Sequence, residues 1–132
     1  MTYHYETVMQ VRDYECDLQG IVNNANYLHY AEHTRHLFLK QQGVSFVQMH
    51  NMGEDPVVAR MELKYKVPLR SDDNFRSCIR VKKEGLKYVF FQDIYRESDN
   101  KLSFRATVEV VCLVNGSMAE SEICNKAFAE FF

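Results

Sequence analysis

The sequence of 132 residues has no tryptophan, two prolines and five glycines, and no apolar run approaches the roughly 20 residues that a membrane-spanning helix needs. It also has no block of about five or more like charges, and its net charge is −2 with histidine neutral. These absences argue against a membrane span, and against nucleic acid or an anionic membrane as the main partner.

Cysteine is sparse and scattered along the chain. The four cysteines are Cys16, Cys78, Cys112 and Cys124. They form no Cys-x-x-Cys pair, which argues against a zinc ribbon or a dithiol redox motif. The first residues, Met-Thr-Tyr-His-Tyr-Glu, lack the basic and apolar regions of a signal peptide. We therefore predict a cytoplasmic protein with reduced thiols.

Apolar residues make up 46% of the sequence and charged residues 26%, which is typical of a soluble globular chain. The length suits one domain of ordinary size, and such a domain can bury a core without disulfides or metals. No internal repeat interrupts the sequence. We predict a single domain over residues 1–132, with no metal and no cofactor.

Alternation of apolar and polar residues with a period of two predicts five strands. They cover residues 3–11, 57–67, 75–81, 86–96 and 102–114. Short turn signals separate the later strands at residues 83–85 and 98–100, and a further turn at 115–117 follows the last strand. The tail from residue 120 to residue 132 is expected to contain a short helix.

Between the first two strands the pattern is helical, from about residue 24 to residue 42. The residues predicted on one face are Tyr27, Tyr30, Ala31, Thr34, Leu37, Phe38 and Gln41. Asn23 or Asn24 is the expected N-cap, because its side-chain oxygen can accept a free backbone N–H. Gly43 is expected to end the helix in a left-handed conformation.

The order of elements is therefore β-α-β-β-β-β, which places the protein in the α+β class. Strands joined by short turns form an antiparallel sheet of about five strands, and the long helix must cover its apolar face. Two folds have this order: the hotdog fold, whose curved sheet wraps around the central helix, and the cystatin-like fold. Periodicity does not distinguish them, whereas the loop before the helix does.

That loop resembles the active-site segment of hotdog-fold thioesterases, in particular the YbgC and 4-hydroxybenzoyl-CoA thioesterase group. In their pattern an Asp is followed by x-x-Gly-[Ile/Val]-Val and then, after three intervening residues, by Asn-Tyr. The matching residues are Asp17, Gly20, Ile21, Val22, Asn26 and Tyr27. The run Val22-Asn23-Asn24 is also similar to a segment of acyl-carrier-protein thioesterases. The resemblance implies a hotdog-fold thioester hydrolase.

The resemblance also implies roles for single residues. It assigns Asp17 as nucleophile or general base, and it assigns polarisation of the thioester carbonyl to the backbone N–H seven residues later, which is that of Asn24. A helix N-terminus carries such unpaired N–H groups and about half a positive charge. YbgC-type enzymes usually have His at this position. The Asn24 side chain is thus a second candidate for contacting water or the carbonyl.

Four more residues of the loop are expected at the substrate. Gly20 lets the backbone turn tightly beside the ligand, and Val22, Asn23 and Tyr27 are predicted to contact it. The implied substrates are acyl-CoA or acyl-carrier-protein thioesters. Proteins similar to this one pair their sheets edge to edge, so we expect a homodimer or homotetramer with the site at the subunit interface.

Other interpretations remain open. The main alternative is a non-catalytic acyl-CoA-binding or sensing hotdog module, which keeps the pocket but does not need Asp17. A hotdog dehydratase would need a histidine that this loop lacks, and a cystatin-like interaction protein would leave the motif unexplained. On the helix, His29, His33 and His36 are interpreted as a solvated face or a subunit contact, not a metal site. Glu32 and Arg35 are interpreted as an ion pair or surface charges.

Overall fold

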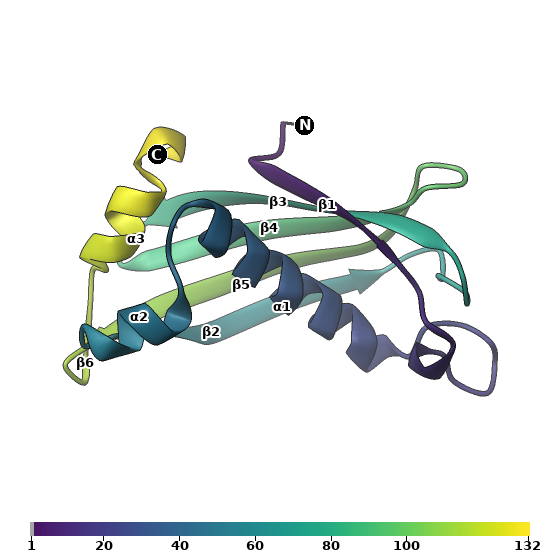
Figure 1. The fold of residues 1–132 in the computed structure, drawn as a ribbon, viewed down its shortest axis with the longest axis horizontal. Helices are drawn as coiled ribbons and strands as arrows, with labels where there is room; N and C mark the ends of the chain where they lie inside the picture. Colours follow the sequence, from purple (N-terminus) through teal and green to yellow (C-terminus); the bar gives the residue numbers. More distant parts are fainter. Residues whose placement is uncertain (1) are drawn as a thin grey trace.

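A long helix lies across one face of an antiparallel sheet in the computed structural model, which describes residues 2–132 (Figure 1). The strands are β1 (Tyr5–Gln10), β2 (Glu54–Tyr65), β3 (Asn74–Glu84), β4 (Lys87–Arg96), β5 (Lys101–Val114) and β6 (Ser117–Ala119). The helices are α1 (Asn24–Gln41), α2 (Phe46–Asn51) and α3 (Glu122–Ala127), with 3₁₀ turns at Asp13–Glu15 and Ala129–Phe131. The strand order is β1-β3-β4-β5-β2, with β6 paired to β5. The predicted α+β hotdog fold is confirmed, whereas α2 and β6 were not predicted.

The hairpin between β5 and β6 turns at an asparagine and a glycine. Asn115 and Gly116 have φ angles of 52° and 87° and lie between the paired residues Val114 and Ser117. Two successive residues with positive φ make the type I′ turn, whose twist matches that of the flanking strands. The turn predicted after the fifth strand therefore leads into β6 instead of ending the sheet.

Helix α1 begins and ends at the predicted residues. The Asn23 side chain accepts a hydrogen bond from the backbone N–H of Ala25 at 3.0 Å, which makes Asn23 the N-cap. Gly43 has a φ of 81°, and the N–H groups of Gly43 and Val44 donate to the carbonyls of Lys40 and Leu39. This pair of bonds is the Schellman motif, which satisfies carbonyls that the helix end leaves free.

The buried face of α1 differs from the prediction on one side. Arg35 and Leu39 are buried, whereas Leu37 is only partly buried and Gln41 is exposed. Ala31, Arg35 and Leu39 lie four residues apart and so form one row along the helix. The buried face of α1 therefore includes this row, whereas the apolar pattern had placed it on the side of Leu37 and Gln41. The interpretation of Arg35 as a surface charge is wrong.

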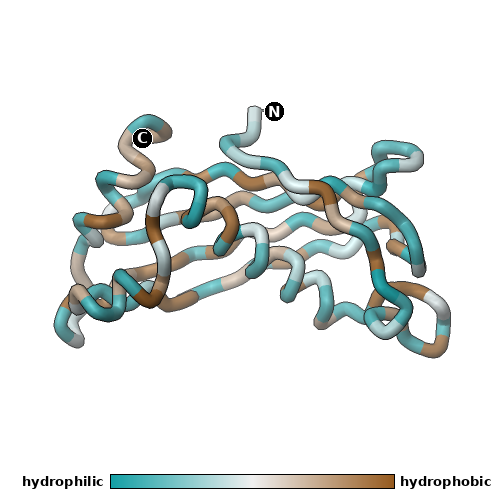
Figure 2. Tube along the Cα trace, viewed as in Figure 1, coloured by the Kyte–Doolittle hydropathy of each residue, from teal (hydrophilic) through white to brown (hydrophobic). Residues whose placement is uncertain are grey.

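The core lies between α1 and the sheet and is rich in aromatic side chains. Phe38, Phe75 and Phe104 are completely buried, and the rings of Tyr30 and Phe75 lie 4.6 Å apart. Figure 2 shows hydrophobic and hydrophilic residues in alternation along the strands, as a sheet with one face on the core requires. Aromatic pairs add packing energy beyond the area that they bury.

Three further observations concern residues 2–132. No helix in this range is long and apolar enough to cross a membrane. All four cysteines are free thiols, and Cys78, Cys112 and Cys124 are buried. No group of His, Cys, Asp and Glu side chains in the same range has an arrangement that could hold a metal ion.

His4 connects the start of the chain to its end. Its Nδ1 accepts a hydrogen bond from the backbone N–H of Val81 at 3.0 Å, and its ring stacks on Phe131 with centroids 4.1 Å apart. Burial lowers the pKa of His4, the charge of Arg80 lowers it further, and Glu130 opposes both. Because Nδ1 accepts a hydrogen bond here, it carries no proton, and the folded protein holds the neutral ring.

We expect this arrangement to make the protein less stable in mild acid. The unfolded chain protonates His4 at the ordinary pKa of 6.5, whereas the folded chain does so only at lower pH. The contribution of His4 to the stability of the protein is thus complete above its unfolded-state pKa, and it is lost as the pH falls toward its folded-state pKa. Melting temperatures of wild type and His4→Phe at about pH 7.5 and about pH 5.5 test this. The acid-induced drop should be smaller in the variant, and equal drops would contradict the prediction.

Candidate functional site

The loop that carries the predicted motif is closed by backbone hydrogen bonds. The N–H of Asp17 donates to the carbonyl of Ile21, and the N–H of Gly20 donates to the carbonyl of Asp17, both at 3.0 Å. Gly20 has a φ of 79°, a conformation that other residues adopt with strain. The N–H of Val22 donates to Leu69 at 2.8 Å and fixes the loop to the segment after β2. Gly20 therefore makes the predicted tight turn.

The Asp17 carboxylate is partly buried, and its neighbour is Gln19. The Asp17 Oδ1 accepts the backbone N–H of Gln19 at 3.0 Å. With its amide nitrogen turned toward Asp17, the Gln19 side chain also donates to Oδ1 at 2.7 Å and to Oδ2 at 3.0 Å. None of the ion pairs among residues 2–132 includes Asp17. The carboxylate is thus oriented by amide donors, without a cationic partner.

A cavity of about 260 Å³ adjoins this carboxylate. Its lining residues are Asp17, Ile21, Val22, Asn24, Tyr27, Tyr65, Lys66, Val67, Pro68 and Ser103. Four of the six predicted site residues therefore meet at one cavity. The other two, Gly20 and Asn23, do not line it and instead hold the turn and the helix cap.

The first residue of α1, Asn24, lines this cavity and has an unpaired backbone donor. Within residues 2–132, the backbone N–H of Asn24 makes no hydrogen bond, whereas the next N–H, of Ala25, is taken by the Asn23 cap. The Asn24 carbonyl accepts from the hydroxyl of Tyr65 at 3.1 Å. An unpaired N–H at the positive end of an 18-residue helix suits a developing negative charge.

Tyr27 forms one wall of the cavity, and its hydroxyl is already engaged. The hydroxyl accepts the backbone N–H of Leu69 at 3.0 Å, and the ring stacks on Phe104 with centroids 5.3 Å apart. Burial raises the pKa of Tyr27, so the phenol stays neutral. Tyr27 can therefore shape the cavity and position the loop, and its neutral hydroxyl keeps its own proton.

Glu15 is a structural residue that the sequence analysis missed. It is buried, and its Oε1 accepts from the Arg12 N–H at 2.7 Å and from the Tyr30 hydroxyl at 2.8 Å. Its backbone carbonyl accepts the Asn23 N–H at 2.9 Å. Burial, followed by the bond to Glu15, raises the pKa of Tyr30. Glu15 thus ties the loop to α1, and only its position two residues before Asp17 hinted at such a role.

Ser103 is a second residue that the sequence did not reveal. It lies on β5, is only 1% exposed, and lines the cavity beside Asp17. Its Oγ has no hydrogen-bond partner within the described part of the chain. Buried hydroxyls are normally bonded, so this one is available to a bound molecule or a water. A lone serine in an alternating strand carries no sequence signal for that role.

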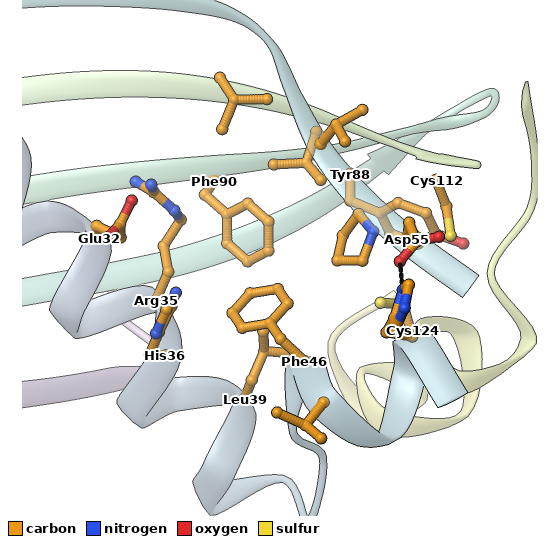
Figure 3. Close-up of a pocket in the computed structure, with 16 residues that line it drawn as sticks. Glu32, Arg35, His36, Leu39, Phe46, Asp55, Tyr88, Phe90, Cys112 and Cys124 are labelled. Carbon is orange, nitrogen blue, oxygen red and sulfur yellow. Dashed lines mark hydrogen bonds and ion pairs between the residues drawn. The ribbon is translucent and has the colours of Figure 1, made fainter. Parts of the chain in front are cut away.

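A larger cavity, of about 520 Å³, lies between α1, α2 and the sheet (Figure 3). Its walls include Leu39, Phe46, Phe90 and Val110, and Arg35 stands at one side of it. It shares no lining residue with the Asp17 cavity. Of the helix histidines, His36 lines this cavity, and all three are exposed.

The fold and this loop define a class: hotdog-fold proteins with a carboxylate beside the N-terminus of the central helix. The sequence profile described as the Thioesterase-like superfamily matches residues 11–127. The chain belongs to that superfamily.

Similar proteins agree with this membership. The chain is 35% identical over 91 residues to the acyl-acyl carrier protein thioesterase ATL3 of Arabidopsis thaliana, a match that covers 69% of this chain and 48% of ATL3. It is 31% identical over 97 residues to ATL2 of the same plant, covering 74% of this chain and 52% of ATL2. The chain therefore spans about half the length of these two relatives.

Solved structures with the same fold cover almost the whole chain. The probable thioesterase YbaW from Escherichia coli is 25% identical, with a TM-score of 0.82 over 98% of this chain and 100% of that one. A 1,4-dihydroxy-2-naphthoyl-CoA thioesterase from Synechocystis has a TM-score of 0.88 over 96% of both chains at 14% identity, which shows a common fold alone.

Proposed function

We propose that this protein hydrolyses acyl thioesters to a carboxylic acid and a thiol. The observation that carries the proposal is the meeting, at one cavity, of the Asp17 carboxylate and the helix residue whose backbone N–H is unpaired, Asn24. Membership of the Thioesterase-like superfamily supports the same reaction. The proposed reaction requires no metal or redox cofactor.

In this proposal the thioester carbonyl oxygen lies at the N-terminus of α1, where the Asn24 N–H and the helix dipole stabilise negative charge. Such a donor contributes roughly 3–4 kcal/mol to the transition state in other hydrolases. Asp17 then attacks the carbonyl carbon and a water later cleaves the resulting anhydride, or it removes a proton from an attacking water. Either way the C–S bond breaks, the acyl carbon gains hydroxyl, and the sulfur leaves as thiol.

The remaining loop residues support this geometry in different ways. Val22 and Tyr27 are proposed to contact the substrate from the cavity wall. Gly20 and Asn23 are proposed to serve it by holding the turn and the cap. The substrate is proposed to be an acyl-CoA or an acyl carrier protein thioester, since ATL3 is named for the second and the Synechocystis protein for a CoA thioester. A cytoplasmic location fits the four free thiols.

Release of free thiol from a panel of acyl-CoA and acyl-carrier-protein thioesters tests the proposal. We expect turnover of at least one substrate in the panel, with the acid and the thiol formed in equal amounts. The rival is a non-catalytic acyl-CoA-binding module. Tight binding of a thioester that is never hydrolysed would replace the proposal with that rival.

A homodimer or homotetramer is proposed as the working form. Strand β2 is at the edge of the sheet, and the Val57 and Val58 side chains on it are 41% and 48% exposed. A twelve-residue edge strand presents unpaired backbone groups that a second copy can bind. Light scattering at micromolar concentration should give at least the mass of a dimer, and a monomer would contradict the proposal.

Ser103 is expected to position the substrate or the water. Ser103→Ala should lower kcat by about tenfold, the value of one hydrogen bond, because the free hydroxyl would no longer bond to the reacting group. Its melting temperature should not fall, since the hydroxyl has no partner in the folded chain. Ser77→Ala is the matched control. That buried hydroxyl bonds to Thr34 at 2.7 Å, so its loss should lower stability without changing kcat. An unchanged kcat in Ser103→Ala would exclude the role.

A further inference from the structure

Arg35 is a buried cation that makes no ion pair within the part of the chain that the structure describes. It is only 7% exposed, and its one hydrogen bond within residues 2–132 runs from Nη1 to the Gln92 Oε1 at 2.9 Å. None of the ion pairs in that range includes it. A guanidinium has five N–H donors. Most of the donors of Arg35 are therefore free for another molecule.

The position of this guanidinium is fixed in advance. Gln92 is 1% exposed, and its Nε2 donates to the carbonyl of Ala31 on α1 at 2.8 Å, so its oxygen faces Arg35. Glu32 lies one turn earlier on α1, is exposed, and makes no ion pair within the described chain. Burial lowers the pKa of Arg35, and Glu32 only opposes this shift. An isolated buried charge is costly unless an anion accompanies it.

The cavity beside Arg35 has mostly apolar walls. Its volume of about 520 Å³ lies within the range of ligand pockets. Figure 3 shows Arg35 on one side, Cys112 and Cys124 on the opposite side, and Phe46 and Phe90 between them. Glu32 also lines the cavity, and Figure 3 shows it beside Arg35, but it makes no ion pair within residues 2–132. The other polar residues do not pair with Arg35 either. His50 and Asp55 pair with each other at 2.6 Å, and His36 packs against Phe46.

From these observations we infer that the cavity between α1, α2 and the sheet is a binding site for an alkyl carboxylate, with the carboxylate on Arg35 and the chain running between Phe46 and Phe90 toward Cys124. A planar carboxylate can accept two parallel N–H groups of a guanidinium. An inorganic anion would satisfy Arg35 but leave the apolar walls uncovered. An uncharged alkyl group would cover the walls but leave the cation unpaired. Only a molecule with both parts fits both.

Calorimetric titration of the wild-type protein with octanoate, 1-octanol and acetate separates the two parts. We expect octanoate to bind about tenfold or more tightly than octanol, the difference made by hydrogen bonds to a charged group, and acetate not to bind at millimolar concentration. Equal binding of octanoate and octanol, or no binding of octanoate, would overturn the inference. This comparison needs no variant, so it holds even if a substitution prevents folding.

Arg35→Met tests the assignment of the head group. The variant should lose the preference for octanoate while its affinity for octanol stays within about threefold, because the apolar walls are unchanged. Arg60→Met is the matched control. This exposed arginine pairs with Glu62 and Glu109 and does not line the cavity, so its removal should leave the affinities for octanoate and octanol unchanged. If Arg35→Met keeps the preference, another group binds the carboxylate.

A second copy of the chain could instead supply the acid to Arg35. In that case octanoate would not bind, and Arg35→Met would weaken association in sedimentation experiments, an outcome that overturns the inference. The acid bound here is the product of the proposed reaction only if that proposal holds. Because the Asp17 cavity shares no lining residue with this one, Asp17→Asn should bind octanoate as wild type does. Octanoate binding without any thioester turnover would defeat the proposed function alone, and turnover without octanoate binding would defeat this inference alone.

Discussion

Asp17→Asn is expected to lower kcat/KM for thioester hydrolysis by about 10²–10⁴-fold, the range in which positioned carboxylates and bases contribute. The amide can neither attack the carbonyl carbon nor take a proton from water. The Asn side-chain oxygen can still accept the Gln19 N–H that the Asp17 Oδ1 accepts, so the turn should persist. Thiol release on the best substrate of the panel is the measurement, with the melting temperature as a check on folding.

Asp13→Asn is the control for this substitution. Asp13 lies four residues before Asp17 in the same segment, is exposed, and bonds to the hydroxyl of Ser71. The same chemical change at this position should leave kcat/KM within about twofold, as expected of a surface substitution. Full turnover by Asp17→Asn, or an equal loss in both variants, would show that Asp17 is not the reacting carboxylate.

Asn24→Pro is expected to lower kcat by about 10²–10³-fold, the effect of removing one oxyanion donor. Asn24 is the first residue of α1, where proline is well tolerated because the N–H has no partner within the helix. Asn23 already has φ −60° and ψ 138°, which suits a residue before proline. The substitution thus deletes the proposed donor while the helix keeps its cap.

Asn24→Ala separates the backbone from the side chain. It keeps the N–H and removes only the amide, so kcat should stay close to wild type if the backbone acts. Should Asn24→Ala instead lose as much activity as Asn24→Pro, the side chain would be the contact. If both variants stay fully active, carbonyl polarisation does not occur at this end of α1. Circular dichroism confirms in each case that α1 is intact.

Much of the fold could be predicted because its determinants are local. Helix α1 was expected from about residue 24 to residue 42 and runs from Asn24 to Gln41, since both of its ends depend on nearby residues, Asn23 and Gly43. Helix α2 escaped prediction because six residues are too few to establish a period. Its one local signal is Ser45, whose hydroxyl caps Gln48 at 3.1 Å.

The site was predictable only where the motif is contiguous. Asp17, Val22 and Asn24 became candidates because they stand close together in one loop, and the fold brings them to one cavity; their roles stay a prediction. Glu15, Ser103 and Arg35 were not found, or were misjudged, because burial of a polar residue depends on what packs over it. A charged or hydroxyl side chain looks like a surface residue until the tertiary structure covers it.

The hydrogen bond from the Tyr65 hydroxyl to the Asn24 carbonyl joins the last residue of the edge strand β2 to the first residue of α1. A second copy bound to β2, as proposed, would therefore also hold the proposed carbonyl-polarising end of α1 through the Tyr65 hydroxyl. If both proposals hold, this hydrogen bond couples assembly to the geometry of the site, and dissociation should lower kcat before the chain unfolds. Because linked equilibria are reciprocal, a ligand bound in the cavity beside Asn24 should in turn strengthen the association of the subunits.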